Sequence, residues 1–207
     1  MVTSGERCVI VKQIPVGPMS NFVYVLTEPE SREALVVDSG WEIEPILKSV
    51  EESRSKVKFV VSTHSHFDHV SSIDELAHEL RARAVAHVNS PVERDLMVDD
   101  GDELKLGKRG VRVIHTPGHT EDSMCLYDGK NLFTGDTLFV GTIGKFARES
   151  SKAMYESLNL ILKLPDSTIV FPGHDYGEVQ FRVLGEEKLT NPFLLTRDLR
   201  SFLSLYA

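Results

Sequence analysis

The chain alternates short apolar runs with longer amphipathic stretches. The apolar runs are rich in β-branched residues and end near Pro or Gly, which is typical of strands. In the first half, strands are predicted over 8–14, 21–27, 34–37, 57–62 and 85–88. Two stretches repeat apolar residues every three or four positions, which predicts helices over 42–52 and 71–80.

The second half shows the same alternation in a different sequence. Strands are predicted over 111–115, 124–127, 131–134 and 168–171, and helices over 151–164 and 196–206. Two strand-rich halves that each carry helices predict an α/β fold, with two sheets packed face to face and helices outside. Because no shift in composition marks a boundary, we expect one domain over residues 1–207, ending in a helical tail from about 178 to 207.

Composition narrows the possible functions. A chain of 207 residues with 41% hydrophobic content can build one sizeable core. Its net charge of −8 argues against a nucleic-acid partner, which would require a basic surface. Residues 1–7 are polar, and no run approaches the roughly 18 apolar residues that span a bilayer, so we expect a soluble, cytoplasmic protein without a membrane partner. Cys8 and Cys125 are expected to be reduced thiols.

The most informative segment is Ser62-Thr63-His64-Ser65-His66-Phe67-Asp68-His69, between a predicted strand and a predicted helix. In an extended segment, residues two apart point to the same side, so His64 and His66 can face one point. As the chain turns toward the helix, Asp68 and His69 return to a second point nearby. Neutral imidazoles and carboxylates together suit zinc, iron or manganese, so the segment predicts a metal site.

Three further donors follow predicted strands, each directly after a glycine. They are His119 in Thr-Pro-Gly-His-Thr, Asp136 in Thr-Gly-Asp-Thr and His174 in Pro-Gly-His-Asp. A glycine lets the backbone turn sharply, so the next side chain can project from the edge of a sheet. Together with the first segment, these residues place donors at the ends of four strands, as a site between two sheets requires.

In motif, order and spacing these residues resemble the metallo-β-lactamase superfamily, from about Ser20 to His174. The resemblance implies a four-layer αββα sandwich and two divalent metal ions, zinc and/or iron, or manganese. It also implies two ligand sets and a bridge: His64, His66 and His119 on one ion, Asp68, His69 and His174 on the other, and Asp136 bridging the two. His78, His87 and His115 fall outside the motif, and we expect them on a helix surface or in strands.

The segment around Asp136 and the following Gly144-Lys145-Phe146 resemble the glyoxalase II (hydroxyacylglutathione hydrolase) branch. That resemblance implies that Lys145 and Tyr176 contact the substrate. Two features depart from it. Ala147 replaces a second substrate tyrosine, and only 33 residues follow His174, too few for the full helical domain of that branch.

This branch implies hydrolysis of small thioesters by a metal-activated water, with Asp68 as ligand and orienter of the nucleophile. Because of the two departures, we expect only a weak preference for glutathione as the thiol.

Other functions fit the same motif. Persulfide dioxygenases share the scaffold but hold one iron, for which His64 or His66, His119 and Asp136 are the candidates. His174-Asp175-Tyr176 and the later Glu187 and Asn191-Pro192 also resemble that branch, whereas the run Asp136-Thr137-Leu138-Phe139 favours the hydrolase. Lactone or β-lactam hydrolysis would use the same activated water. A non-catalytic binding protein would be expected to have lost ligands, and none is lost here. The sequence does not predict an oligomeric state.

Overall fold

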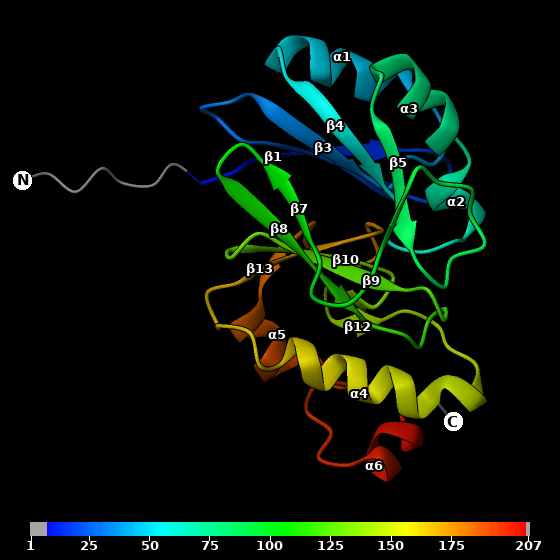
Figure 1. Ribbon diagram of the computed structural model, residues 1–207. Coiled ribbons are helices and arrows are strands. Elements are labelled where there is room, and N and C mark those ends of the chain that lie inside the picture. Colours follow the sequence, from blue (N-terminus) through cyan, green and yellow to red (C-terminus); the bar gives the residue numbers. More distant parts are fainter. Residues whose placement is uncertain (1–7, 206–207) are drawn as a thin grey trace, which may run out of the picture.

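The structure is a computed structural model that describes residues 8–205. Residues 1–7, whose polar character entered the localisation expectation, and Tyr206, in the predicted last helix, lie outside the described residues. Two six-stranded sheets face each other, with helices on both outer sides (Figure 1). The predicted αββα sandwich is therefore confirmed.

The first sheet contains the strands of the N-terminal half in chain order. They are β1 (Ile10–Val16), β2 (Asn21–Thr27), β3 (Glu33–Val37), β4 (Lys56–Val61), β5 (Arg83–His87) and β6 (Leu96–Val98). The first three strands pair antiparallel, and β3 to β6 pair parallel. The carboxyl ends of the parallel strands share one edge, and the histidine-rich segment follows β4 at this edge.

The second sheet has its strands in the order β14 (Arg182–Val183), β13 (Ile169–Pro172), β10 (Asn131–Gly135), β9 (Met124–Tyr127), β8 (Arg109–His115) and β7 (Glu103–Leu106). A separate hairpin joins β11 (Leu138–Phe139) to β12 (Thr142–Ile143). The helices are α1 (Glu44–Ser53), α2 (Phe67–Val70), α3 (Ile73–Leu80), α4 (Ser151–Ile161), α5 (Leu184–Thr190) and α6 (Leu199–Ser204), with a 3-10 turn η1 at Arg148–Ser150.

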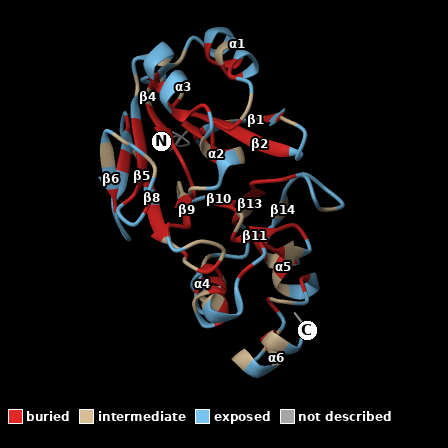
Figure 2. Cartoon of the chain, turned by 90° about the vertical axis from the view of Figure 1, so that its right-hand side faces the viewer, coloured by how far each residue is buried: buried red, intermediate tan, exposed pale blue. Residues whose placement is uncertain are grey.

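Three apolar clusters hold the four layers together. One, including Tyr24, Leu126 and Phe133, lies between the sheets. A second packs α1 and α3 on the first sheet, and a third packs α4 and α6 on the second sheet. In Figure 2 the strands are mostly buried, whereas the helices expose their outer faces. Burying one large apolar side chain contributes about 1.5–3 kcal/mol, so these clusters supply most of the force that sets the layers.

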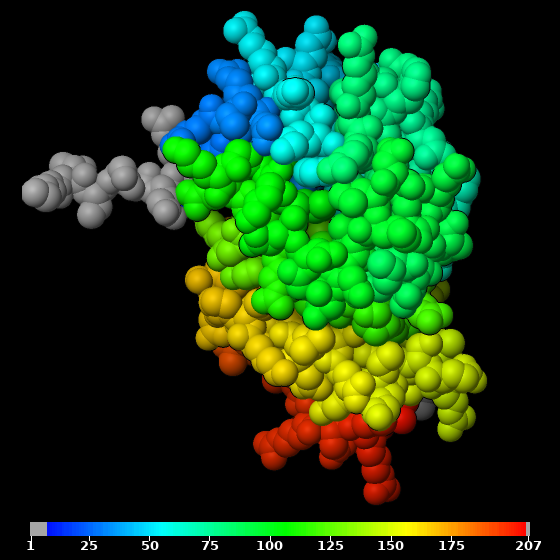
Figure 3. Space-filling view, in the orientation of Figure 1, coloured from blue at the N-terminus to red at the C-terminus, as the bar shows by residue number. Residues whose placement is uncertain are grey.

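The layers also follow the order of the chain. In Figure 3 the N-terminal segments occupy one end, the middle segments the centre, and the C-terminal segments the other end. Each sheet is therefore built from its own half of the sequence. The loops that carry the predicted donors meet only where the two halves contact each other.

Several predicted boundaries were wrong by a few residues, for local reasons. The first helix begins at Glu44, with Pro45 in its first turn, where a missing N–H costs little. The last begins at Leu199 because Asp198 forms a capping box with Ser201. The predicted helix over 71–80 is preceded by the separate turn α2 and starts at Ile73.

The short strands β6, β7, β11, β12 and β14 were missed. The tail from 178 contains β14 as well as the short helices α5 and α6. Within residues 8–205, no helix is both long and apolar enough to cross a membrane.

Candidate metal centre

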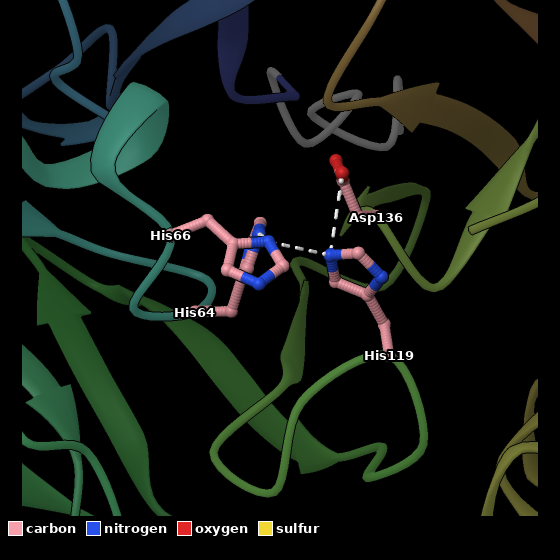
Figure 4. A group of neighbouring side chains, drawn as sticks. All are labelled: His64, His66, His119 and Asp136. Atoms are coloured by element: carbon pink, nitrogen blue, oxygen red, sulfur yellow. Dashed lines mark hydrogen bonds and ion pairs between the residues drawn. The ribbon is translucent and has the colours of Figure 1, made fainter. Parts of the chain in front are cut away.

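Four donors converge at the end of β4. His64 Nε2 lies 3.2 Å from His66 Nδ1, which in turn lies 2.9 Å from His119 Nε2. Asp136 Oδ2 lies 3.5 Å from the same His119 nitrogen. Figure 4 shows these side chains, from three separate loops, pointing toward one point. Their ligand atoms all lie within 4.8 Å of one another, so the group could hold a metal ion.

A second group lies beside the first. It contains Asp68 and His69 from α2, and His174 after β13. The two Nε2 atoms of His69 and His174 are 3.1 Å apart, and Asp68 Oδ2 is 3.3 Å from the His174 nitrogen. Asp136 faces this group too, because its Oδ1 lies 3.3 Å from His69 Nε2 and its Oδ2 lies 3.4 Å from His174 Nε2. All seven residues proposed from the sequence are thus together, with Asp136 between the groups.

Four imidazoles are oriented by a contact at their outer nitrogen. The Nδ1 partners are Thr63 Oγ1 for His64 (3.1 Å), Asp38 Oδ2 for His69 (3.0 Å), the Lys145 carbonyl for His119 (2.6 Å) and the Met19 carbonyl for His174 (2.9 Å). An acceptor at Nδ1 keeps the proton there and leaves Nε2 as a lone pair. The arrangement therefore directs the four Nε2 atoms to the centre, where a cation would replace any second proton that an imidazole holds.

Sequence reasoning missed two residues that support the ligands. Asp38 is buried and accepts hydrogen bonds from Thr63 N (2.7 Å) and Thr63 Oγ1 (2.9 Å), in addition to its contact with His69. Asn21 is also buried, and its Nδ2 donates to Asp68 Oδ2 at 2.9 Å. Asp38 carries the signal that marked the other donors, since it follows a buried strand and precedes Ser39-Gly40.

Close backbone approach explains two of the glycines near the ligands. A Cβ on Gly173 would lie 2.5 Å from Asp136 Oδ1 and 2.9 Å from His69 Cε1. A Cβ on Gly135, which has a φ of +47°, would lie 2.3 Å from Thr63 Oγ1. Neither position tolerates a side chain while the ligands keep their places.

Burial and charge set the protonation of the centre. Burial lowers the pKa of His64 and of His119, which favours the neutral form that binds metals. Burial also opposes a charge on His174, but the carboxylates of Asp136 and Asp68 outweigh it and raise the pKa of His174 to about 9. For both carboxyl groups, burial would raise the pKa, but hydrogen bonds from His174 and other neighbours lower it. Both carboxylates are therefore ionised at neutral pH.

The residues present fit one or two divalent cations. The Oδ1 atom of Asp136 is buried and accepts no hydrogen bond of good geometry. The facing imidazole nitrogens, 2.9–3.2 Å apart, repel one another unless a proton or a cation lies among them. A set of five imidazoles and two carboxylates suits zinc, iron or manganese and does not select among them.

The two residues expected to contact substrate differ in their setting. The ring of Tyr176 stacks on His174, with centroids 4.6 Å apart, and is 53% exposed. The side chain of Lys145 is exposed, and its backbone carbonyl is the part that contacts His119. Ala147 is exposed nearby in the sequence. Tyr176 thus forms a wall of the centre, whereas substrate contact by either residue remains a prediction.

The remaining histidines lie outside both donor groups. His78 is 88% exposed on α3, as expected for a helix-surface residue. His87 ends β5 and His115 ends β8, in agreement with the prediction that both are strand residues, and their rings stack 4.0 Å apart.

Comparisons with known proteins place this geometry in a family. The model of the metallo-beta-lactamase superfamily matches residues 16–174. A hydroxyacylglutathione hydrolase from Chromohalobacter salexigens is 32% identical over 176 residues, or 83% of this chain and 69% of that protein. The crystal structure of ETHE1 from Myxococcus xanthus is 32% identical and has a TM-score of 0.88, over 95% of this chain and 89% of that one.

A further similar structure is that of TTHA1623 in a di-iron-bound form. It is 28% identical with a TM-score of 0.76, over 89% of this chain and 100% of that one. The family model spans most of the chain and includes every residue of the two donor groups. The chain therefore belongs to the metallo-β-lactamase superfamily.

Proposed function

We propose that this protein is a metal-dependent hydrolase of small thioesters. The observation that carries the proposal is the pair of adjacent donor groups with Asp136 facing both. Similarity to hydroxyacylglutathione hydrolases supports the thioester as substrate class. When two cations are bound, they would lower the pKa of a shared water toward neutrality and polarise the substrate carbonyl.

The chain's own residues have three tasks in this reaction. His64, His66, His69, His119 and His174 would hold the cations together with Asp68 and Asp136. Asp68, fixed by the amide of Asn21, would orient the attacking water as well as bind metal. Tyr176, on the face of His174, and Lys145, beside His119, would position the thioester. The thiolate leaves without a strong general acid, because the pKa of a thiol is only about 8.5 and the thiolate is therefore already a stable leaving group.

Recognition of glutathione is expected to be weak. Ala147 stands where the resemblance to glyoxalase II would imply a second substrate tyrosine, so that contact is removed. Each lost charge-assisted contact costs about 1.5–3 kcal/mol, or roughly 10- to 150-fold in specificity. The test compares kcat/KM for a lactoyl thioester of glutathione with that for the same acyl group on a simple thiol. A glutathione preference of a thousandfold or more would contradict weak recognition.

A persulfide dioxygenase is the second candidate, and the near-full-length match to ETHE1 favours testing it directly. His64 or His66, His119 and Asp136 would then hold a single iron. Oxygen uptake with glutathione persulfide, measured on iron-loaded protein beside thioester hydrolysis, separates the two candidates. Oxygen consumption without thioester cleavage would replace the hydrolase proposal with the dioxygenase.

A further inference from the structure

A pocket of about 710 Å³ adjoins the candidate metal centre at Tyr176. The ring of Tyr176 borders the pocket and also stacks on His174, so the pocket begins one side chain away from the donors. The hairpin residues Val140 and Thr142 form another part of its wall. A substrate whose acyl carbon lies at the metal centre would place its thiol portion near Tyr176, which borders this space.

The pocket wall is fixed by a buried carboxylate. Glu187 is fully buried, and its Oε2 accepts hydrogen bonds from Gly141 N and Asn191 Nδ2, both at 2.9 Å. Asn191 Nδ2 also donates to the carbonyl of Thr142 at 3.1 Å. These bonds join the C-terminal segment to the β11–β12 hairpin, part of which lines the pocket. The segment from Glu187 to Asn191 thus has a structural role in shaping the pocket.

The charge balance inside this pocket is negative. Its lining includes Arg182, Glu178 and Glu186. Arg182 lies 3.3 Å from Glu187, 3.2 Å from Glu178 and 3.9 Å from Glu186. Three carboxylates surround one guanidinium that is only 16% exposed, so Arg182 is already paired and the group carries an excess of negative charge.

A second pocket, of about 530 Å³, is also lined by negatively charged side chains. It is lined by Glu42 and by Asp175, the chain neighbour of Tyr176, together with uncharged residues. Within the described part of the chain, the linings of the two pockets contain four carboxylates and one cation, Arg182. A ligand that enters beside Tyr176 therefore lies close to the carboxylates of the first pocket and to Asp175.

We propose that Glu178 and Glu186 set the charge preference of the enzyme, selecting thioesters whose thiol portion is cationic or neutral over those whose thiol portion is anionic. This inference rests on the proposed thioester hydrolysis. It also gives a second reason for weak recognition of glutathione, whose carboxylates would be repelled in the pocket. Because both glutamates are largely exposed, water screens them, and the selection should amount to about three- to tenfold.

The test uses three acetyl thioesters that differ in the charge of the thiol: acetylthiocholine, S-acetyl-N-acetylcysteamine and S-acetyl-3-mercaptopropionate. Metal-loaded wild-type protein should show the highest kcat/KM for the cationic ester and the lowest for the anionic ester. About 1 M NaCl should shrink this ratio, because it shortens the screening length to about 3 Å.

The double variant Glu178→Gln/Glu186→Gln should reduce the cationic-to-anionic ratio by about three- to tenfold and improve use of the anionic ester, since Arg182 keeps only Glu187 as a partner. The matched control is Glu79→Gln/Glu156→Gln, which removes two exposed carboxylates that line neither pocket and should leave all three rates unchanged. Equal metal content in all proteins is verified first.

The outcomes are distinct. A wild-type preference for the anionic ester, or a ratio that neither the double variant nor salt changes, overturns the charge selection alone. No hydrolysis of any of the three esters by metal-loaded protein overturns the proposed function and this inference with it.

Discussion

Replacing Asp38 by asparagine should weaken metal binding even though Asp38 faces no metal. The carboxylate uses Oδ1 to accept from Thr63 N, and Oδ2 to accept from Thr63 Oγ1 and His69 Nδ1. An amide of the same shape has one acceptor oxygen and one NH₂ donor. In either orientation, at least one of these donors would face the NH₂ group. His69 then loses the contact that orients its ring, or Thr63 moves and disturbs His64.

The size of the effect follows from the role of such partners at metal sites. Loss of a carboxylate behind a metal-binding histidine typically costs about 10- to 100-fold in metal affinity. This corresponds to about 1.4–2.7 kcal/mol. Because Asp38 contacts His69 directly, the ion held by Asp68, His69 and His174 should be lost first. Metal content should fall toward one ion per chain before the second is lost.

The assay is metal stoichiometry by elemental analysis, with affinity measured by chelator competition. Asp128→Asn is the matched control, since Asp128 accepts three hydrogen bonds, from Lys130 N, Asn131 N and Asn131 Nδ2, in a turn that contains none of the donors. It should lower thermal stability without changing metal affinity. If Asp38→Asn also lowers only the melting temperature and leaves both affinities unchanged, Asp38 does not orient His69 for metal binding.

Three other outcomes follow from the structure. Asp136→Ala should abolish activity and lower metal content far more than His78→Ala does, because Asp136 faces both donor groups whereas His78 is exposed on α3. Equal losses of activity and metal in the two variants would show that the site is misassigned. Metal affinity should fall by at least about tenfold per pH unit below pH 9, because a cation must displace the proton that His174, with its pKa raised to about 9, holds below that pH. The pKa of His69 is raised as well, by the carboxylates of Asp38 and Asp136, so its proton adds to this dependence. Chelator competition at pH 6.5 and 8.5 measures the change, and equal affinities would contradict it. Burial raises the pKa of the Cys125 thiol to about 12. A thiol reagent at pH 8 should therefore react quickly with the exposed Cys8 in the native protein, and with Cys125 only after denaturation. Rapid reaction of both thiols in the native protein would contradict the burial of Cys125.

The sequence by itself determined which residues can bind metal and which segments form the sheets and the outer helices. His64, His66, Asp68 and His69 are close in the chain, so a strand end followed by a turn is enough to bring them together. Apolar periodicity also predicted the long strands and helices, since these bury a face along their whole length. Strands such as β6 and β14 were missed because two or three residues carry no readable period. They become strands only by pairing with a neighbour that is already in place.

Tertiary structure decided how the donors are held and what surrounds them. Asp38 reaches His69 across 31 positions, and the Met19 carbonyl reaches His174 across 155. Nothing in the local sequence of either partner predicts such a contact. The pairing of Arg182 with three glutamates beside Tyr176 likewise arises only when the C-terminal segment folds back onto the β11–β12 hairpin. Which residues can bind metal depends on side-chain chemistry, which can be read from the sequence. The orientation of those side chains and the charge around the pocket depend on distances between remote residues, which only the packing of the fold fixes.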